Sequence, residues 1–490
     1  MIGRFARTIT KQHPLQVAAR LPNAVVARAV WNVPDSIPPR SIGSWPSAPG
    51  ALRSLANAEQ ARGEARLSRL PPGRLRAYEE CYGLELGAEG RAPRAEWKSR
   101  VAIEPFPASV RARRIAVAIR CGGQGLEREL ARAARAVIVR PELHLMGNHL
   151  LENGFALACA GAAARGLESD LWWRAGTRLL GWQLRQQFLV DGGHVERSAS
   201  YHLALTAALL ETIELAHSSG RGVPPMWKEV AARALGWAAY VRAPDGTYPL
   251  FNDAALDASP TVDAVLDLGR ALDINPWPME RLEATGWVCV QVDSARLVVD
   301  AGPDADGWQP GHAHADGLAF ELWVHGKRVV VDFGVSSYEP GQSRDETRAT
   351  RSHNTVELGG QDSCEVWGGF RVGRRGRGRV ATDEVRAGAA HLELEHDGYA
   401  WLPGAPRHVR SMQLRPGRLE VKDRIMGGSE AWVSRLRVDA ATGVRVGSYG
   451  GVSCRDDRWY PRHAEACPAR VYEQRGRAGS GEGVVWLLEW

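Results

Sequence analysis

The spacing of apolar residues divides the chain into two parts with different periods. From residue 76 to residue 284, apolar positions recur every three or four residues, which is typical of amphipathic helices. One such stripe consists of Leu171, Ala175, Leu179 and Trp182. Short breaks such as "DGGH" and "PDGTYP" separate successive stripes, and no strand-like alternation interrupts them. This part is therefore predicted to be a set of helical hairpins that build an all-α bundle or toroid.

Near Gly286 the period changes to that of β-strands. The segments "WVCVQVD", "ARLVVD", "LAFELWV" and "HLELEH" are short and alternate apolar with polar positions, and "VHGKRV" predicts a tight hairpin turn. Because no helical pattern separates these strands, residues 285–490 are predicted to form an antiparallel sheet stack. Helices followed by strands indicate an α+β chain of two domains with a cleft between them.

Residues 1–75 are rich in Pro, Arg and Ala, and the piece "WNVPDSIPPRSIGSWPSAPG" contains too many prolines for regular structure. We expect an extended arm or linker here. The chain has no apolar run of about 18 residues that would predict a transmembrane helix. The N-terminus lacks the apolar core of a secretory signal, so the cytoplasm is the default expectation. The seven cysteines show no CxxC spacing and predict neither a disulfide framework nor a zinc ribbon.

The charge of the chain leaves two interpretations open. The 490 residues carry a net charge of +6, mostly from arginine. Several arginines cluster within nine positions: Arg371, Arg374, Arg375, Arg377 and Arg379. Guanidinium groups match the geometry of carboxylate, sulfate and phosphate, so the cluster indicates either an acidic partner or an ordinary solvated face. Because no nucleic-acid-binding module accompanies the charge, no nucleic-acid partner is predicted.

The segment from Gly311 to Asn354 carries the densest candidate chemistry. His312 and His314 stand two apart in "GHAHADGLAFEL", Asp332 follows on an apolar strand, and His353 follows a polar loop. Zinc prefers imidazole and carboxylate ligands, and imidazole also moves protons near neutral pH. Residues two apart on a strand point to the same side. Both histidines could therefore bind a metal, or one could bind it while the other reaches a substrate.

Two earlier motifs lie at predicted helix starts. Asn148 and His149 begin the apolar helix of "MGNHLLENGFALACAG", and "DGGHVERSASYH" carries Glu196, Arg197 and Tyr201. Taken singly, an asparagine at this place is as often an N-cap, and an isolated histidine is more often a structural residue. The functional signal lies in their combination with the later histidines.

Six motifs occur in a fixed order over residues 100–420: "GNHLLENGFAL", "DGGHVERSASYH", "PLFNDA", "GHAHADGLAFEL", "VVVDFGVSSY" and "RSHNTVELGG". Together they resemble the heparinase II/III-like family of polysaccharide lyases. The resemblance implies an incomplete (α/α) toroid followed by an antiparallel β-sandwich, in agreement with the two hydrophobic periods. It also implies cleavage of uronic-acid polysaccharides by β-elimination. That reaction requires stabilisation of the charge developing on the sugar carboxylate, a base for the C5 proton and an acid for the departing oxygen.

The resemblance implies four catalytic residues. Asn148 resembles the amide that binds the substrate carboxylate, and His149 resembles a histidine that acts as base for one C5 configuration or assists neutralisation. Tyr201 resembles the tyrosine that acts as base, acid or both, and His312 the histidine that reaches across the cleft from the β-domain. A tyrosine has an ordinary pKa of about 10, so a cation such as Arg197, one helical turn earlier, would favour its phenolate.

The resemblance also implies a cofactor and further substrate contacts. It implies one structural zinc ion per chain, held by His314, Asp332 and His353. Tyr338 resembles a second tyrosine that some relatives place in the loop before His353. The residues themselves indicate substrate contacts from Arg197, Arg348 and Trp367, and a solvated loop is the alternative interpretation for Arg348.

The leading hypothesis is a lyase that acts on an acidic polysaccharide. A homo-oligomer is left open, and the family resemblance also allows a periplasmic or secreted protein. One rival is a glycoside hydrolase on the same toroid, which needs two carboxylates facing one bond, with Glu152, Glu196 and Asp253 as candidates. The other is a non-catalytic polysaccharide-binding protein linked to exopolysaccharide synthesis.

Overall fold

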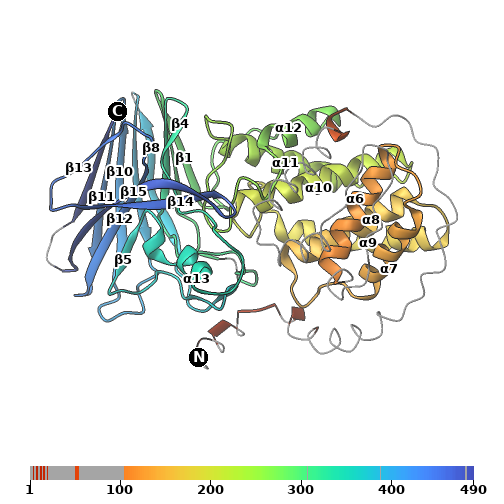
Figure 1. Cartoon of the computed structure of the whole chain (residues 1–490), viewed down its shortest axis with the longest axis horizontal. Helices are drawn as coiled ribbons and strands as arrows, with labels where there is room; N and C mark the ends of the chain where they lie inside the picture. The colour runs from red at the N-terminus through yellow and green to blue at the C-terminus, as the bar shows by residue number, and fades with distance from the viewer. Residues whose placement is uncertain are drawn as a thin grey trace.

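The computed structural model describes residues 104–490 except 306, 387 and 480–482, together with short pieces between residues 4 and 53. Most of the predicted arm over residues 1–75 lies outside the described residues, as do residues 76–103. Figure 1 shows a helical part and a β part side by side. The prediction of an α+β chain is confirmed.

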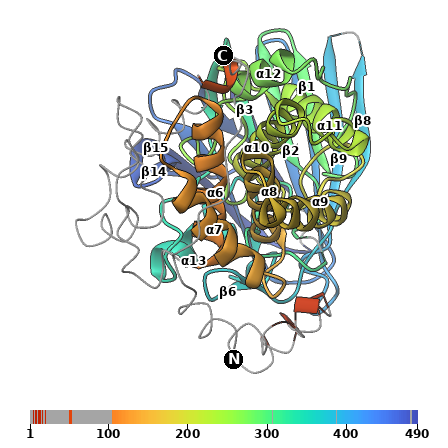
Figure 2. The ribbon, with the colours of Figure 1, turned by 90° about the vertical axis from the view of Figure 1, so that its right-hand side faces the viewer.

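The helical part consists of helices joined by short loops. Its members are α6 (Pro105–Arg120), α7 (Glu127–Val139), α8 (Gly147–Ala163), α9 (Leu167–Gln187), α10 (Ala199–Ser218), α11 (Pro225–Val241) and α12 (Val262–Ala271). Nearly every residue of α8 and α10 is buried, as expected for helices that are apolar on all sides. Figure 2 shows these two helices in the middle of the helical part; α6, α7 and α9 pack against α8, and α11 and α12 against α10.

Buried ion pairs cross the interior of the helical part. Arg113 on α6 donates to Glu152 on α8 at 2.7 Å and also pairs with Glu211 on α10. About two turns further along α6, Arg120 donates to Glu214 on α10 at 2.9 Å. Because a buried charge without a partner is strongly destabilising, these pairs fix the mutual register of α6, α8 and α10. Glu152 is thereby committed to the packing of the helices.

The β part consists of two antiparallel sheets and a short hairpin. The larger sheet has the order β1 (Trp287–Val292), β2 (Ala295–Asp300), β3 (Phe320–Val324), β4 (Lys327–Val330), β12 (Ala431–Asp439), β15 (Glu465–Arg477) and β14 (Ser453–Arg462), and β5 (Val356–Leu358) also pairs with β12. The second sheet has the order β13 (Arg445–Ser448), β16 (Val484–Glu489), β11 (Arg418–Met426), β10 (Arg407–Arg415), β9 (Ala389–His396) and β8 (Gly378–Arg386). The hairpin pairs β6 (Val366–Trp367) with β7 (Arg371–Val372), and α13 (Gln342–Arg348) and the 3-10 turn η2 (Thr350–Ser352) precede β5.

The alternation seen in the sequence explains how the two sheets pack. In β9 the residues Ala390, Leu392 and Leu394 are buried, and the residues between them are partly exposed. The buried faces of both sheets contribute to one apolar cluster, as in a β-sandwich. The predicted hairpin turn is also confirmed, because His325 and Gly326 link β3 to β4 with φ angles of 50° and 76°, as a two-residue type I′ turn requires.

An apolar seam fixes the β part against the helices. Trp287, Trp323 and Trp459 from the β part belong to the same buried cluster as the core of the helical part. Groups on both sides of this seam are therefore held at fixed distances from one another. Within the described part of the chain, the helices are either too short or too polar to cross a membrane.

Close packing of α8 against α9 predicts a strict requirement for glycine at one position. A Cβ atom on Gly176 would overlap the backbone of Ala158, whereas a Cβ on Gly181 in the same helix would meet open space. We expect Gly176→Ala to lower the free energy of unfolding by about 1–3 kcal/mol through overpacking. Gly181→Ala, the matched control, should be neutral or stabilising by up to about 1 kcal/mol because alanine favours helix. Thermal unfolding followed by circular dichroism measures both, and equal midpoints for the two variants would contradict the packing argument.

Candidate active site

The start of α8 presents Asn148 to a buried carboxylate. The backbone N–H of Asn148 donates to Glu196 at 2.9 Å, and its side-chain amide donates to both oxygens of Glu196 at 2.8 and 3.1 Å. Glycine suits the preceding position, because Gly147 has a φ of 55° and a Cβ there would meet the side-chain ends of Gln309 and Glu196 at 2.3 and 2.5 Å. The positive end of the α8 dipole adds to the attraction for an anion at this point.

His312 reaches this position from the β part. Its Nε2 lies 3.2 Å from the amide nitrogen of Asn148 and 3.7 Å from a carboxylate oxygen of Glu196. The ring of Tyr201, in the first turn of α10, lies 4.1 Å from the His312 ring, centroid to centroid. The structure therefore brings three of the predicted catalytic residues together from α8, α10 and the β part.

Asp253 lies on the other side of the His312 ring. Its carboxylate is fully buried and lies 2.7 Å from Nδ1 of His312 and 2.8 Å from Nε2 of His314. Arg344 on α13 donates to both of its oxygens, one of them at 2.6 Å. Sequence reasoning considered Asp253 only as a candidate carboxylate of a hydrolase. Its place in "PLFNDA" was the available signal, but spacing alone does not reveal which side chains a loop residue meets.

The surroundings shift the pKa values of the groups at the centre of the site. Burial opposes ionisation of Glu196, but His312, His194 and the hydrogen bonds from Asn148 outweigh it and hold its pKa below the ordinary value. The pKa of Asp253 is likewise held well below its usual range, because Arg344, His312 and His314 outweigh the effect of burial. Burial, aided by Tyr338, Asp253 and Glu196, raises the pKa of Tyr201 well above 10. Both carboxyl groups are therefore ionised near neutral pH, and the Tyr201 phenol keeps its proton.

Tyr338 is the predicted substrate-binding residue that joins this centre. Its hydroxyl donates to the backbone carbonyl of Asp253 at 3.2 Å, and its ring lies 4.7 Å from that of His463. The exposed ring of Phe370, at the tip of the β6–β7 hairpin, lies 6.1 Å from His312. Phe370 therefore borders the His312 imidazole, and Tyr338 borders the backbone of Asp253.

Arg197 has partners other than those expected from the sequence. Its guanidinium is buried and donates to the backbone carbonyls of Val195, Ala284 and Thr285 at 3.2, 3.4 and 3.0 Å. Ala284 and Thr285 lie in the connection between α12 and β1. Asp191 also contacts this connection, because it accepts a hydrogen bond from the backbone N–H of Thr285 at 2.6 Å. The predicted support of a Tyr201 phenolate is corrected accordingly, because Arg197 fastens the connection between α12 and β1 and the phenol stays protonated.

Arg348, Trp367 and His149 also have contacts that the sequence did not indicate. Arg348 is buried and donates to the carbonyls of Ala313 and Gly369 at 3.0 and 2.8 Å, so it shapes the backbone around the site and corrects the expected direct substrate contact. Trp367 donates from its indole to the hydroxyl of Thr8 at 3.2 Å. The His149 ring pairs with Glu142 at 3.0 Å and lies 4.4 Å from the ring of Phe106.

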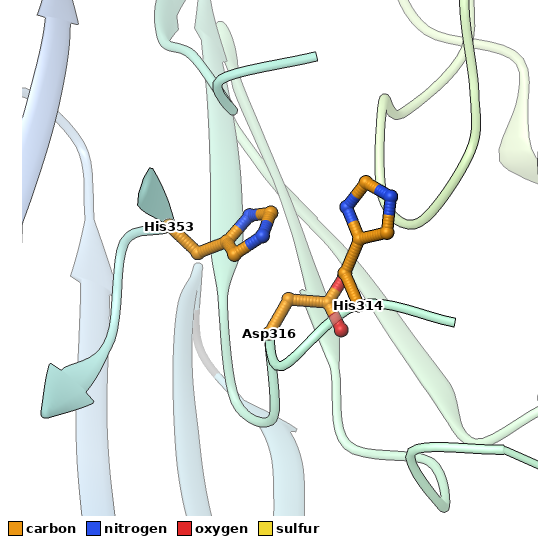
Figure 3. Close-up of side chains that lie close together, drawn as sticks. All are labelled: His314, Asp316 and His353. Carbon is orange, nitrogen blue, oxygen red and sulfur yellow. The ribbon is translucent and has the colours of Figure 1, made fainter. Parts of the chain in front are cut away.

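A candidate metal centre lies next to the cluster of Asn148, Tyr201 and His312. Figure 3 shows the side chains of His314, Asp316 and His353 converging, and one possible ligand atom from each lies within 4.8 Å of those of the other two. All three residues are buried, and burial lowers the pKa of His314 to about 3, so its ring is neutral as a metal ligand must be. Nδ1 of His314 and Nε2 of His353 are buried ring atoms without a hydrogen-bond partner among the described residues. The donor set therefore fits a zinc ion.

Asp332, which was predicted as a metal ligand, contacts the ring of His353. Its carboxylate lies 2.9 and 3.0 Å from Nδ1 of His353, the ring nitrogen opposite the orphaned Nε2. The carboxylate that the structure brings to the candidate ligand atoms is that of Asp316, which the sequence-based prediction missed. Its signal was present in "GHAHADGLAFEL", where Asp316 stands two residues after His314.

Comparison with known sequences identifies similar proteins. The sequence pattern described as Heparinase II/III N-terminus matches residues 133–271, and that described as Heparinase II/III-like, C-terminal, matches residues 274–471. A heparin-sulfate lyase of Bacteroides stercoris is 26% identical over 240 residues, which cover 43% of this chain and 35% of that protein. The chain thus spans about a third of the length of this curated relative.

Comparison with solved structures shows the same fold. The crystal structure of a heparinase III has a TM-score of 0.63 at 14% sequence identity and covers 95% of this chain and 88% of its own. A heparan sulfate lyase from Pedobacter heparinus has a TM-score of 0.56 at 16% identity, with 96% of this chain and 88% of its own covered. The helical part followed by the β part is therefore the toroid and sandwich of these proteins.

The contacts of Arg197 predict a structural effect of its removal. Arg197→Met leaves buried carbonyl groups without their donors, so we expect the free energy of unfolding to fall by at least about 2 kcal/mol. Arg351→Met, at an exposed arginine, is the control and should change stability by no more than about 0.5 kcal/mol. Thermal unfolding midpoints compare the two variants. A midpoint for Arg197→Met equal to that of the control would show that these carbonyl contacts do not stabilise the connection between α12 and β1.

Proposed function

Because the chain belongs to the heparinase II/III-like family, we propose that it is a polysaccharide lyase that cleaves an acidic, uronate-containing polysaccharide by β-elimination. The single observation that carries the proposal is the convergence of Asn148, Tyr201 and His312 from α8, α10 and the β part. An amide, a phenol and an imidazole within reach of one sugar unit are the groups that the reaction needs. The curated relative is named a heparin-sulfate lyase, so sulfated glycosaminoglycans are the first polymers to test.

The chemistry assigns a distinct task to each group. The Asn148 amide donates to the uronate carboxylate and stabilises the negative charge that spreads onto it as the C5 proton leaves. When the carboxylate takes this donor, the Nε2 lone pair of His312, which faces Asn148 at 3.2 Å in the free protein, is released to accept the C5 proton. The C4–O bond then breaks, the C4=C5 double bond forms, and the departing oxygen takes a proton from Tyr201. The raised pKa of this phenol suits the role of acid, because the group carries its proton near neutral pH.

The electrostatics favour a lyase over a glycoside hydrolase. A hydrolase needs one carboxylic acid that holds its proton, which requires a raised pKa, beside a second carboxylate. Glu196 and Asp253 both have lowered pKa values, and Glu152 is paired with Arg113 in the helical core. Among the three carboxylates considered, none has the environment of a proton donor to a glycosidic oxygen.

We also propose that His314, Asp316 and His353 hold one zinc ion per chain, while Asp332 orients His353 from outside. Ligating histidines usually donate their second ring N–H to a carboxylate, and Asp253 and Asp332 accept from the second nitrogens of His314 and His353. When bound, zinc would supply a crosslink between the segment that carries His312 and the turn that carries His353. The residues of the catalytic cluster carry out the proton transfers.

The first test follows the absorbance of the unsaturated product on a panel of uronate polymers. We expect Tyr201→Phe, His312→Ala and Asn148→Ala each to lower kcat by about 10²–10⁴-fold, because each removes a group that acts on the developing charge or on a proton. Tyr449→Phe, at an exposed tyrosine, is the control and should retain the wild-type rate. New reducing ends without ultraviolet absorbance would indicate a hydrolase, and binding without either signal a non-catalytic protein.

A fluorinated substrate separates the acid from the base. Fluoride leaves without a proton, so a 4-deoxy-4-fluoro uronide should restore most of the activity of Tyr201→Phe and little of that of His312→Ala. Equal rescue of both variants would contradict the division of roles between phenol and imidazole.

The zinc proposal is tested by elemental analysis of protein purified without chelator. We expect about one zinc per chain in the wild type and a loss of bound zinc in Asp316→Ala, since this change removes a ligand. Asp332→Asn should retain zinc at saturating metal but bind it about 10–100-fold more weakly, as is typical when an outer carboxylate is changed. Retention of zinc by Asp316→Ala together with its complete loss in the Asp332 variant would reverse the two assignments.

A further inference from the structure

We propose that Asp253 is a positioning residue that sets, with one carboxylate, the opposite tautomers of the catalytic His312 and the metal-site His314. The inference rests on the proposed function for the role of His312 in the reaction. It concerns a residue that touches neither substrate nor metal itself. Its effect is exerted through the ring nitrogens that the two histidines present.

The surroundings of Asp253 hold it rigidly. Its carboxylate has no exposed surface, and each of its two oxygens accepts a hydrogen bond from the guanidinium of Arg344. Its backbone N–H donates to the carbonyl of His312 at 3.2 Å. Its backbone carbonyl accepts hydrogen bonds from the hydroxyls of Ser198 at 2.9 Å, Ser200 at 3.2 Å and Tyr338 at 3.2 Å. A carboxylate fixed at both its side chain and its backbone imposes its geometry on the imidazoles that it meets.

An ionised carboxylate can only accept hydrogen bonds, and this fact determines the tautomers. Asp253 contacts His312 at Nδ1 and His314 at Nε2. Each of these nitrogens must therefore carry a hydrogen. In the neutral rings, His312 then presents the lone pair of Nε2 toward Asn148, and His314 presents the lone pair of Nδ1 toward the candidate metal centre. The two histidines are two residues apart in the chain, and they contact the same carboxylate through different ring nitrogens, Nδ1 of His312 and Nε2 of His314.

The bidentate contact with Arg344 makes the arrangement possible. A buried carboxylate is costly unless it is paired, and Arg344 is itself fully buried, with a further donation to the carbonyl of Gly369 at 3.0 Å. The ion pair therefore keeps Asp253 in the acceptor-only form on which both tautomers depend.

The chain contains a matched arrangement away from the site. Asp423 accepts from His408 at 2.7 Å and from Arg410 at 2.7 and 2.9 Å, and it is buried between the sheets of the sandwich. This group shares with the Asp253 group one buried carboxylate, one bidentate arginine and an imidazole, and it differs in having a single histidine. Asp423→Asn is therefore the control for the structural cost of replacing such a carboxylate.

The test compares Asp253→Asn with Asp423→Asn in zinc-loaded protein. An amide accepts from one side and donates from the other, so it cannot accept from both histidines. We expect Asp253→Asn to lower kcat by about 10²–10⁴-fold with a change in KM of less than about threefold, as when an imidazole is held in the wrong tautomer. Asp423→Asn should lose stability and keep its kcat. Equal losses of kcat in the two variants, or a wild-type kcat in Asp253→Asn, would overturn the proposal.

The tautomers are measured directly by ¹⁵N–¹H spectra of the histidine rings, with signals assigned by His312→Ala and His314→Ala. The wild type should show a protonated Nδ1 on His312 and a protonated Nε2 on His314, and Asp253→Asn should change at least one of these signals. This readout needs no activity, and the wild-type spectrum alone suffices if Asp253→Asn does not fold. The opposite tautomer of either ring in the wild type would refute the role of Asp253. The expected tautomers in a chain without lyase activity would support that role and refute the proposed function instead.

Discussion

A single buried carboxylate organises the centre of this molecule. Asp253 meets the imidazoles of His312 and His314 and the bidentate guanidinium of Arg344, and it does so without exposure to solvent. Removing one partner from such a group typically costs about 3–5 kcal/mol, because the remaining charge stays buried. Its loop belongs to the helical part, whereas His312 and Arg344 belong to the β part. The same interaction therefore fastens the two parts together and defines the site at their junction.

Pairs of a carboxylate and an imidazole recur throughout the β part and its contacts with the helices. Besides the pairs that His312 and His314 form with Asp253 and that His353 forms with Asp332, buried pairs join His396 to Asp304 at 2.8 Å, His408 to Asp423 at 2.7 Å and His463 to Asp257 at 2.9 Å. Each pair fixes the orientation of a ring whose two nitrogens have different roles. Hydrogen-bonded imidazole and carboxylate groups thus occupy the interior where the helical part meets the β part, while apolar side chains fill the space between the two sheets. Orientation near the site is achieved through hydrogen bonds, and cohesion elsewhere through burial of apolar surface.

Several residues that look like substrate contacts instead hold the backbone around the site. Arg197 and Arg348 donate hydrogen bonds to main-chain carbonyls. Residues in the described pieces near the N-terminus also contact loops of the two parts. Gln16 donates to the carbonyl of Leu145 at 2.9 Å in the helical part, and Arg7 pairs with Glu365 at 2.8 Å in the β part. These contacts secure loops that carry few apolar residues of their own. The precision of the catalytic cluster follows from this support, since reactive groups need to be held within a fraction of an ångström.

The sequence by itself determined the fold class, the order of helices and strands, and three of the residues that meet at the site, Asn148, Tyr201 and His312. The hydrophobic period is a local property, so stripes such as Leu171 to Trp182 and the turn in "VHGKRV" could be interpreted from neighbouring residues alone. Only the tertiary structure decided which partner each polar side chain meets. Asp316 lies with His314 and His353 in the candidate metal centre, Arg197 contacts the connection between α12 and β1, and Asp253 joins two histidines some sixty positions away. Hydrogen bonds are directional and reach only about 3 Å, and the direction of a loop side chain is set by packing between segments distant in the chain, which no local pattern records.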